Sequence, residues 1–347
     1  MSTRTPRTPK SKSRREGTPF VPPRQGINGF EDAFKEYSMM FVGGFVAFAV
    51  GKIQGPKYLP EVAVLPITCL LGGVAAYSLL ALYLLNSGVA PPDNDPHNYV
   101  EGGKKKPALV FLGDSITHQK LSGEFCKMVA KAKPELSIVN CGQNSIGTDT
   151  IVVERVDWVV ACEPKFVSVM IGTNDIKGIY KPEWAEGTIS NFHIKEGEIT
   201  FSTFRRNMTS IVANLVKYTD AKIAVHTLPP MGEDLECEAN TFIYKANSII
   251  KEVVARVGSA RITLIDTFAN LEKYLLETTT KEYREKGLKV DNFGDAKASV
   301  AIKRLLGFGY DACGKPFGLT VMCDALHLND TGAKIVADAV VAWMGEE

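Results

Sequence analysis

The sequence predicts an α/β fold in which a parallel β-sheet is covered by helices on both faces, preceded by a membrane segment near the N-terminus. From residue 107 onward, short apolar runs rich in β-branched and aromatic residues alternate with longer amphipathic runs. This alternation is the pattern of βαβ units, which build parallel sheets. A long uncharged run nearer the N-terminus predicts the membrane segment.

Five strands and five main helices are expected in this region, which we take as one domain covering residues 107–347. The expected strands lie at 108–112, 136–140, 166–171, 223–227 and 261–265. The expected helices lie at about 122–133, 148–162, 203–218, 240–257 and 331–344.

The composition is that of an average folded protein and excludes several classes. Of the 347 residues, 45% are hydrophobic and 23% are charged, which excludes a collagen-like or wholly disordered chain. The net charge of +1 argues against nucleic-acid binding through bulk positive charge. Seven cysteines without a C-x-x-C pair favour free thiols over a disulfide framework or a zinc site. We expect no cofactor and no metal.

The residues before the domain divide into a tail, a membrane zone and a linker. Residues 1–35 are basic and rich in proline, serine and threonine at their start, so we expect them to be disordered. Residues 36–88 contain two uncharged runs, of 15 residues at 37–51 and of 24 residues at 62–85. Residues 89–106 have the composition of a linker.

The second uncharged run is long enough to cross a bilayer, because as a helix it would span roughly 36 Å against a hydrocarbon core of ~30 Å. We expect a two-helix hairpin at about 37–53 and 62–86, since Gly55, Pro56 and Pro60 between the runs favour a turn. Small residues recurring at four-residue spacing favour close packing of the two helices. A single span and a buried soluble helix are the alternatives.

The number of spans decides the location of the domain. The basic tail is expected to stay in the cytosol by the positive-inside rule, and a hairpin returns the chain to the same side. The protein is therefore expected to be an integral membrane protein with its C-terminal domain in the cytosol. A single span would place that domain in a lumen or outside the cell.

Four polar motifs follow the expected strands or precede the last helix. Ser115 stands in Gly-Asp-Ser after the first strand, Gly147 follows the second, and Asn174 stands in Gly-Thr-Asn-Asp after the third. Asp324 and His327 stand in Asp-Ala-Leu-His before the last helix. Because ligands bind at the carboxyl ends of parallel strands, we expect these residues to meet in one site.

These five residues supply complementary parts of one reaction. His327 can act as the base that activates Ser115, and Asp324 can orient the imidazole. The backbone N–H groups of Ser115 and Gly147 and the side-chain amide of Asn174 can bind an oxyanion. The sequence thus predicts nucleophilic catalysis by a serine.

The same motifs resemble those of the SGNH or GDSL-type hydrolases. The similarity covers residues 107–344 and rests on FLGDSIT, the Gly147 block, IGTND and DALHL. The resemblance implies a three-layer α/β/α fold, SGNH or flavodoxin-like, and a metal-free esterase, lipase or thioesterase. It assigns the catalytic triad to Ser115, Asp324 and His327, and the oxyanion hole to Ser115, Gly147 and Asn174.

Three neighbouring residues need separate interpretation. Gly142, in NCGQNSIG, is a rival to Gly147 as the second oxyanion donor, and we prefer Gly147. Asp114 is expected to hold the nucleophile turn, and His118 is expected to be exposed on a helix.

Several segments are expected to shape the substrate site. Residues 228–233 resemble a segment of some family members and are expected to form part of the substrate wall. Two long segments, 177–200 and 278–322, are expected over or beside the pocket. Within the second, residues 296–308 form either a surface helix packed on the domain or a lid that contacts lipid.

The predicted function is a membrane-anchored serine hydrolase that cleaves acyl esters or thioesters. Lysophospholipid-like or other lipid esters are the first expectation, because an anchor concentrates the enzyme at the membrane. A carbohydrate O-acetyl esterase with the same triad and a non-catalytic membrane-bound binding module are the alternatives.

Overall fold

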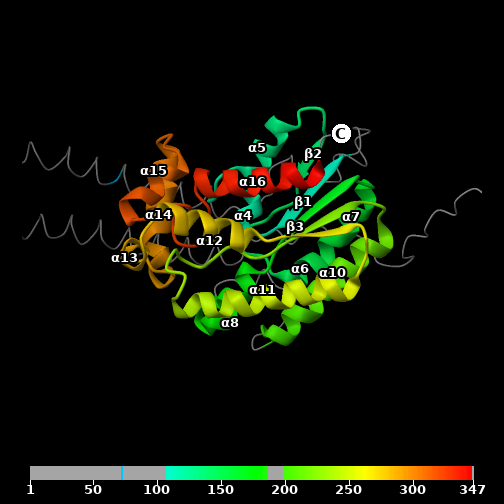
Figure 1. Ribbon diagram of the computed structural model, residues 1–347, viewed down its shortest axis with the longest axis horizontal. Coiled ribbons are helices and arrows are strands. Elements are labelled where there is room, and N and C mark those ends of the chain that lie inside the picture. Colours follow the sequence, from blue (N-terminus) through cyan, green and yellow to red (C-terminus); the bar gives the residue numbers. More distant parts are fainter. Residues whose placement is uncertain (1–71, 73–106, 187–197, 346–347) are drawn as a thin grey trace, which may run out of the picture.

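The sheet of the protein has five parallel strands, as predicted (Figure 1). The computed structural model describes residues 107–186 and 198–345, together with Gly72. The strand order is β2-β1-β3-β4-β5, and every neighbouring pair is parallel. The strands, within two residues of their predicted bounds, are β1 (Leu109–Gly113), β2 (Ile138–Asn140), β3 (Phe166–Met170), β4 (Lys222–His226) and β5 (Ile262–Ile265).

Helices cover both faces of this sheet and give the three layers of the fold (Figure 1). The longer helices are α5 (Phe125–Ala132), α7 (Val156–Cys162), α10 (Phe201–Tyr218), α11 (Glu238–Val257), α12 (Thr267–Thr278) and α16 (Asp330–Met344). On one face α16 contacts α5 and α12, and on the other α10 contacts α11 and α7. The sequence prediction missed α12.

The central strands form the core of the domain. β1 and β3 are buried along their whole length, and their sequences, LVFLG and FVSVM, are almost continuously apolar. A strand has a continuously apolar sequence when helices cover both of its faces, whereas apolar and polar residues alternate in a strand with one exposed face. The edge strand β5 is different, because Thr263 is exposed and its neighbours are only partly buried.

Three helices begin after the carboxyl ends of the first three strands along the chain. They are α4 (Ser115–His118) after β1, α6 (Thr148–Thr150) after β2, and α8 (Thr173–Tyr180) after β3. α6 continues through a π-helical turn (Ile151–Arg155) into α7. Each of the three begins within one residue of a predicted site residue.

The predicted insertion at 278–322 is a group of short helices at one end of the domain (Figure 1, orange). Its helices are α13 (Lys281–Lys286), α14 (Phe293–Leu305) and α15 (Tyr310–Gly314), with 3₁₀ turns at Val290–Asn292 and Lys315–Phe317. Tyr310 attaches it to the end of α4, because its hydroxyl donates to the backbone oxygens of Gln119 and Lys120 at 3.3 and 3.1 Å.

The segment 296–308 combines features of both interpretations offered for it. Val300 is fully buried against Tyr310, as in a helix packed on the domain. Leu306 and Phe308, which follow α14, are 63% and 50% exposed, as in a surface that meets an apolar partner.

The predicted membrane hairpin, apart from Gly72, lies outside the described residues, as do the tail at 1–35 and the linker at 89–106. In the two described ranges, no helix combines the length and the apolar character that crossing a bilayer requires. The hairpin therefore stays a prediction. In the first predicted insertion, the structure describes α9 (Pro182–Glu186), and residues 187–197 lie outside the described part.

Candidate active site

Ser115 is the first residue of α4 and follows β1 after a single-residue turn. Asp114 caps the helix, because its Oδ1 accepts a hydrogen bond from the Ile116 N–H at 3.0 Å. Burial raises the pKa of Asp114, and the hydrogen bond from Ile116 opposes that rise. Only glycine fits at Gly113, where a Cβ would lie 2.4 Å from the carbonyl oxygen of Met170. The turn thereby fixes Ser115 at the carboxyl edge of the sheet.

His327 and Asp324 lie next to Ser115 there. The Oγ of Ser115 lies 2.8 Å from Nε2 of His327, and Nδ1 of His327 lies 2.7 Å from Oδ2 of Asp324. The other carboxylate oxygen of Asp324 accepts the backbone N–H of His327 at 2.7 Å. With Asp324 accepting from Nδ1–H, the lone pair of Nε2 faces the serine hydroxyl.

The loop between these two residues is held in a tight conformation. Ala325 has φ 67°, in the left-handed region, which costs a non-glycine residue about 1–3 kcal/mol. All four residues from Asp324 to His327 are buried, with Asp324 at 0% exposure. A strained backbone conformation inside a buried loop is held in place by the surrounding contacts, as is common at functional sites.

A hydrogen bond brings Asn174 next to the peptide that joins Ile146 and Gly147. Asn174 is the second residue of α8, and its Nδ2 donates to the backbone oxygen of Ile146 at 3.0 Å. That oxygen belongs to the same trans peptide as the N–H of Gly147, so the two point in opposite directions. The side chain of Asn174 therefore orients the Gly147 N–H.

Gly142, the rival donor, has another role. Its N–H donates to Oδ1 of Asn140 at 2.8 Å. A Cβ at Gly142 would lie 2.4 Å from the backbone nitrogen of His118, so glycine is needed for close approach of the chain to α4. The N–H of Gly142 is therefore already bound within the protein.

A buried hydrogen-bond chain holds the start of α6 beside Gly147, and the sequence analysis did not identify it. Both carboxylate oxygens of Asp175 accept from Thr148, one from its N–H at 3.0 Å and the other from its hydroxyl at 2.6 Å. The Thr148 hydroxyl in turn accepts from Nδ2 of Asn207 at 3.1 Å. Burial raises the pKa of Asp175 to about 7, against the lowering effect of the bonds from Thr148. The signal in the sequence was the aspartate directly after Asn174.

The two described histidines outside this triad are buried. The expectation that His118 is exposed was wrong: it is 4% exposed, and Nδ1 lies 2.9 Å from Oδ1 of Asn144. His226 ends β4, with Nε2 at 3.0 Å from the Ser168 hydroxyl and Nδ1 at 2.8 Å from that of Thr267. Burial lowers the pKa of each histidine to about 4.

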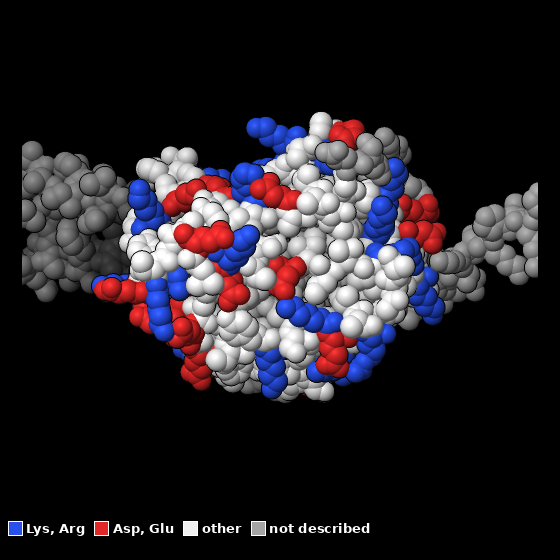
Figure 2. Space-filling view, viewed as in Figure 1, with Lys and Arg blue, Asp and Glu red and all other residues white. Residues whose placement is uncertain are grey.

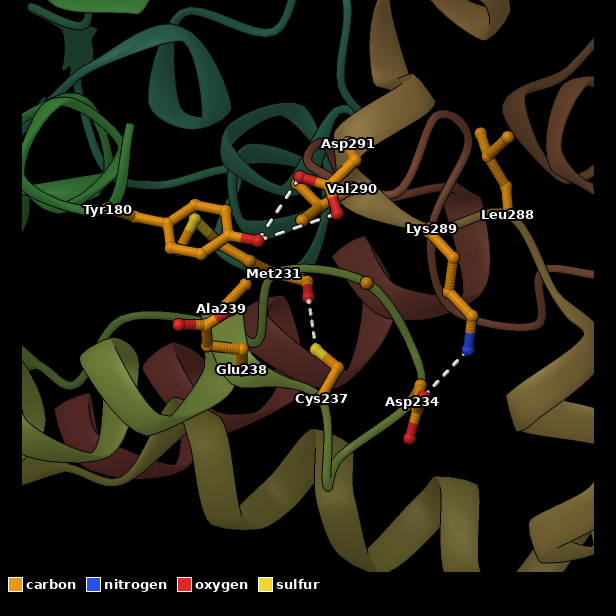
Figure 3. Close-up of a pocket in the computed structure, with 11 residues that line it drawn as sticks. Tyr180, Met231, Asp234, Cys237, Glu238, Ala239, Leu288, Lys289, Val290 and Asp291 are labelled. Carbon is orange, nitrogen blue, oxygen red and sulfur yellow. Dashed lines mark hydrogen bonds and ion pairs between the residues drawn. The ribbon is translucent and has the colours of Figure 1, made fainter. Parts of the chain in front are cut away.

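A pocket of about 130 Å³ opens near the triad loop, by which we mean residues 319–329 (Figure 3). Its lining residues come from the end of α8, the segment after β4, the start of α11 and the predicted insertion: Tyr180, Met231, Gly232, Asp234, Cys237, Glu238, Ala239, Leu288, Lys289, Val290 and Asp291. The Tyr180 hydroxyl donates to Asp291 at 3.2 Å, and Lys289 pairs with Asp234 at 2.7 Å (Figure 3). The insertion at 278–322 thus does form part of a pocket wall.

The segment 228–233 is connected directly to the triad loop. Met231 and Gly232 line the pocket. The N–H of Gly232 donates to the backbone oxygen of Ala325 at 2.7 Å. Glu233 points elsewhere, since it is 1% exposed and binds the backbone of residues 320–322.

On the face shown in Figure 2, the charges do not form a field of one sign, because acidic and basic side chains are interspersed over a largely uncharged surface. Within the described part of the chain, no group of three or more His, Cys, Asp or Glu residues is arranged to hold a metal ion. The cysteines described there are free thiols.

Comparison with known proteins agrees with the resemblance seen in the sequence. The sequence model of the GDSL-like Lipase/Acylhydrolase family matches residues 111–335. No curated protein matches the chain.

Among solved structures, similarity extends over most of the domain at low sequence identity. LAE5, an alpha/beta hydrolase enzyme from the metagenome of Lake Arreo, is 17% identical with a TM-score of 0.48, covering 69% of this chain and 95% of its own. Axe2, an acetylxylan esterase from Geobacillus stearothermophilus, is 18% identical with a TM-score of 0.46, covering 70% of this chain and 97% of its own.

Proposed function

Because the chain belongs to the GDSL-like lipase/acylhydrolase family, a family of ester-hydrolysing enzymes, we propose that it is a membrane-anchored serine esterase whose catalytic triad is Ser115, His327 and Asp324. One observation carries the assignment of the triad. The contacts of 2.8 Å from Ser115 to His327 and 2.7 Å from His327 to Asp324 form an unbroken chain from nucleophile to base to orienting carboxylate.

In the proposed mechanism the Ser115 oxygen attacks the ester carbonyl while Nε2 of His327 takes the hydroxyl proton. Asp324 stabilises the imidazolium that forms. His327 then protonates the leaving alkoxide, and the acyl group remains on Ser115. Water attacks this acyl-enzyme with His327 again acting as base, and the acid leaves.

The tetrahedral intermediates place a negative charge on the former carbonyl oxygen. We assign its stabilisation to the N–H groups of Ser115 and Gly147 and to the amide of Asn174. An amide nitrogen carries two hydrogens, and the bond to Ile146 uses one of them. Donors fixed by the protein backbone stabilise an oxyanion without having to reorganise during the reaction.

For the substrate we propose lipid-like acyl esters or thioesters, such as lysophospholipids, presented at a membrane surface. Two uncharged runs in the first 88 residues support an anchor, and the exposed Leu306 and Phe308 support contact with an apolar phase. Under this proposal the domain lies in the cytosol. Protease digestion of sealed vesicles tests the location, because a C-terminal tag should be digested and a protected tag would contradict it.

A carbohydrate O-acetyl esterase with the same triad is the second candidate. The pocket of about 130 Å³ does not decide between the two, because none of the five proposed site residues lines it.

The chain-length dependence of hydrolysis distinguishes the two candidates. Full-length protein in lipid is offered acyl esters from two to sixteen carbons, with Ser115→Ala as the inactive variant and Ser210→Ala on α10 as the matched control. We expect a long-chain optimum for a lipid esterase and an optimum at two carbons for a deacetylase. Inertness at every length, in folded protein, would contradict the esterase proposal and favour a non-catalytic binding module.

A further inference from the structure

Glu233 is a buried carboxylate that binds three consecutive backbone N–H groups of the triad loop. Its Oε1 accepts from Val321 at 2.7 Å and from Met322 at 2.9 Å. Both of its oxygens lie 2.8 Å from the nitrogen of Thr320. The side chain is 1% exposed, and burial raises its pKa, opposed by these same hydrogen bonds.

The bound segment leads directly into the triad. Met322 precedes Asp324 by two residues and forms an isolated antiparallel bridge with Leu328. The N–H of Cys323 donates to the backbone oxygen of His327 at 2.9 Å, which closes the turn that contains Asp324. A displacement of residues 320–322 would therefore move the base and its orienting carboxylate together.

The opposite side of the same segment is held by Asn329. Its backbone N–H donates to the oxygen of Val321 at 3.0 Å, and its Nδ2 donates to the oxygen of Thr320 at 2.9 Å. Glu233 thus binds the three N–H groups of the segment, and Asn329 binds the carbonyl oxygens of Thr320 and Val321. A loop segment in the protein interior would otherwise leave these groups unsatisfied.

A second contact joins the tip of the loop to the residue before Glu233. Gly232 donates its N–H to the oxygen of Ala325 at 2.7 Å. Gly232 has φ 77°, a conformation that favours glycine. Two consecutive residues thus bind two parts of the triad loop, Gly232 at Ala325 and Glu233 at residues 320–322.

From these contacts we infer that Glu233 is a positioning residue for the hydrolytic reaction, holding residues 320–322 so that Nε2 of His327 lies within hydrogen-bond distance of Ser115. The inference rests on the function proposed above. Glu233 is not among the residues that line the pocket. It acts on the rate of the chemical step through the backbone of the triad loop.

The variant Glu233→Gln tests this role, because the side chain keeps its size but replaces one acceptor oxygen with an NH₂ group. At the place of Oε1 that group would face all three N–H groups, and at the place of Oε2 it would face the Thr320 N–H; it cannot accept from them in either place. A misplacement of about 1 Å at the reacting atoms costs about 100-fold in rate, so we expect kcat to fall by about 10- to 100-fold. KM should stay within about twofold, since the Glu233 side chain is buried against the backbone of residues 320–322.

The first measurement is the rate at which a fluorophosphonate probe labels Ser115 in the full-length protein in lipid, at a temperature below the unfolding temperature of each variant. The second is kcat and KM on the best ester. Glu236→Gln is the matched control, because Glu236 is exposed and pairs only with Lys281 on the surface. Glu233→Asp, which keeps the charge but shortens the reach, should fall between wild type and Glu233→Gln and carries the test if the latter fails to fold.

The outcomes separate this inference from the proposed function. Slow labelling of Glu233→Gln with wild-type labelling of Glu236→Gln supports the positioning role. Equal labelling of wild type and both Glu233 variants, or a loss confined to KM or to thermal stability, overturns it and leaves the esterase proposal intact. A wild-type protein that the probe does not label overturns both.

Discussion

Acid should destabilise this protein through its buried histidines, and His226 allows the effect to be measured. The ring lies between the hydroxyls of Ser168 and Thr267 and is 1% exposed. Burial lowers its pKa from 6.5 to about 4. Between pH 6.5 and about pH 4, this histidine binds a proton in the unfolded chain but not in the folded protein. The free energy of unfolding therefore falls as the pH falls.

The size of the effect follows from the pKa difference. The full shift corresponds to about 3 kcal/mol, and about 2.5 kcal/mol of it is lost between pH 7.5 and pH 4.5. His226→Gln removes the titrating group while keeping a polar side chain that can meet both hydroxyls. The stability advantage of wild type over this variant should therefore shrink by about 2.5 kcal/mol between the two pH values.

Urea unfolding of both proteins at pH 7.5 and 4.5 measures this difference. His118, whose pKa burial also lowers to about 4, titrates in both proteins and cancels. The packing lost in the variant is the same at both pH values and cancels as well. A wild-type advantage that stays constant from pH 7.5 to 4.5 would refute the reasoning.

Three further predictions follow from the site. Asn174→Ala should lower kcat by about 10²- to 10³-fold with little change in KM, measured by steady-state ester hydrolysis; an unchanged kcat would remove Asn174 from the oxyanion hole. Thr148→Val leaves Asp175 and Asn207 without their shared buried partner, so it should destabilise the protein by about 1–3 kcal/mol in urea unfolding; Thr148→Ser should retain that stability, and equal losses would contradict the role of the hydroxyl. Gly113→Ala places a Cβ 2.4 Å from a carbonyl oxygen, so we expect a lower melting temperature, and an unchanged one would show that the turn can relax.

The sheet could be predicted from the sequence because its central strands are buried on both faces. Such strands appear as apolar runs, and β1 and β3 are of this kind. The helix α12 was missed although its signals are present. Asp266 caps it through the Ala269 N–H, and Phe268, Leu271 and Leu275 form its buried face. Its start directly after β5 hid the boundary between strand and helix.

The residues of the site could be predicted because their motifs stand next to the ends of strands or before the last helix. Contacts between residues close in sequence fix their positions: Asp114 caps the helix that begins with Ser115, and a short turn joins Asp324 to His327. The role of Gly142 could not be predicted from the sequence, because its N–H bonds to the side chain of Asn140 and its Cα lies against the backbone of His118.

The supporting hydrogen bonds could not be predicted because they join distant parts of the chain. Glu233 and Thr320 are separated by 87 positions, and Thr148 and Asn207 by 59. The sequence shows that residue 233 is acidic, but it does not show that its carboxylate is buried. Which backbone groups it meets depends on how the segment after β4 packs against the triad loop.

Trapping the acyl-enzyme tests the central claim most directly. Full-length protein in lipid is mixed with its best ester, quenched with acid during turnover and digested, and the peptides are examined by mass spectrometry. The account predicts an acyl adduct on the peptide that contains Ser115, absent in Ser115→Ala, whose turnover should fall by at least about 10³-fold. Turnover that continues in Ser115→Ala, or an adduct on a different residue, would contradict it.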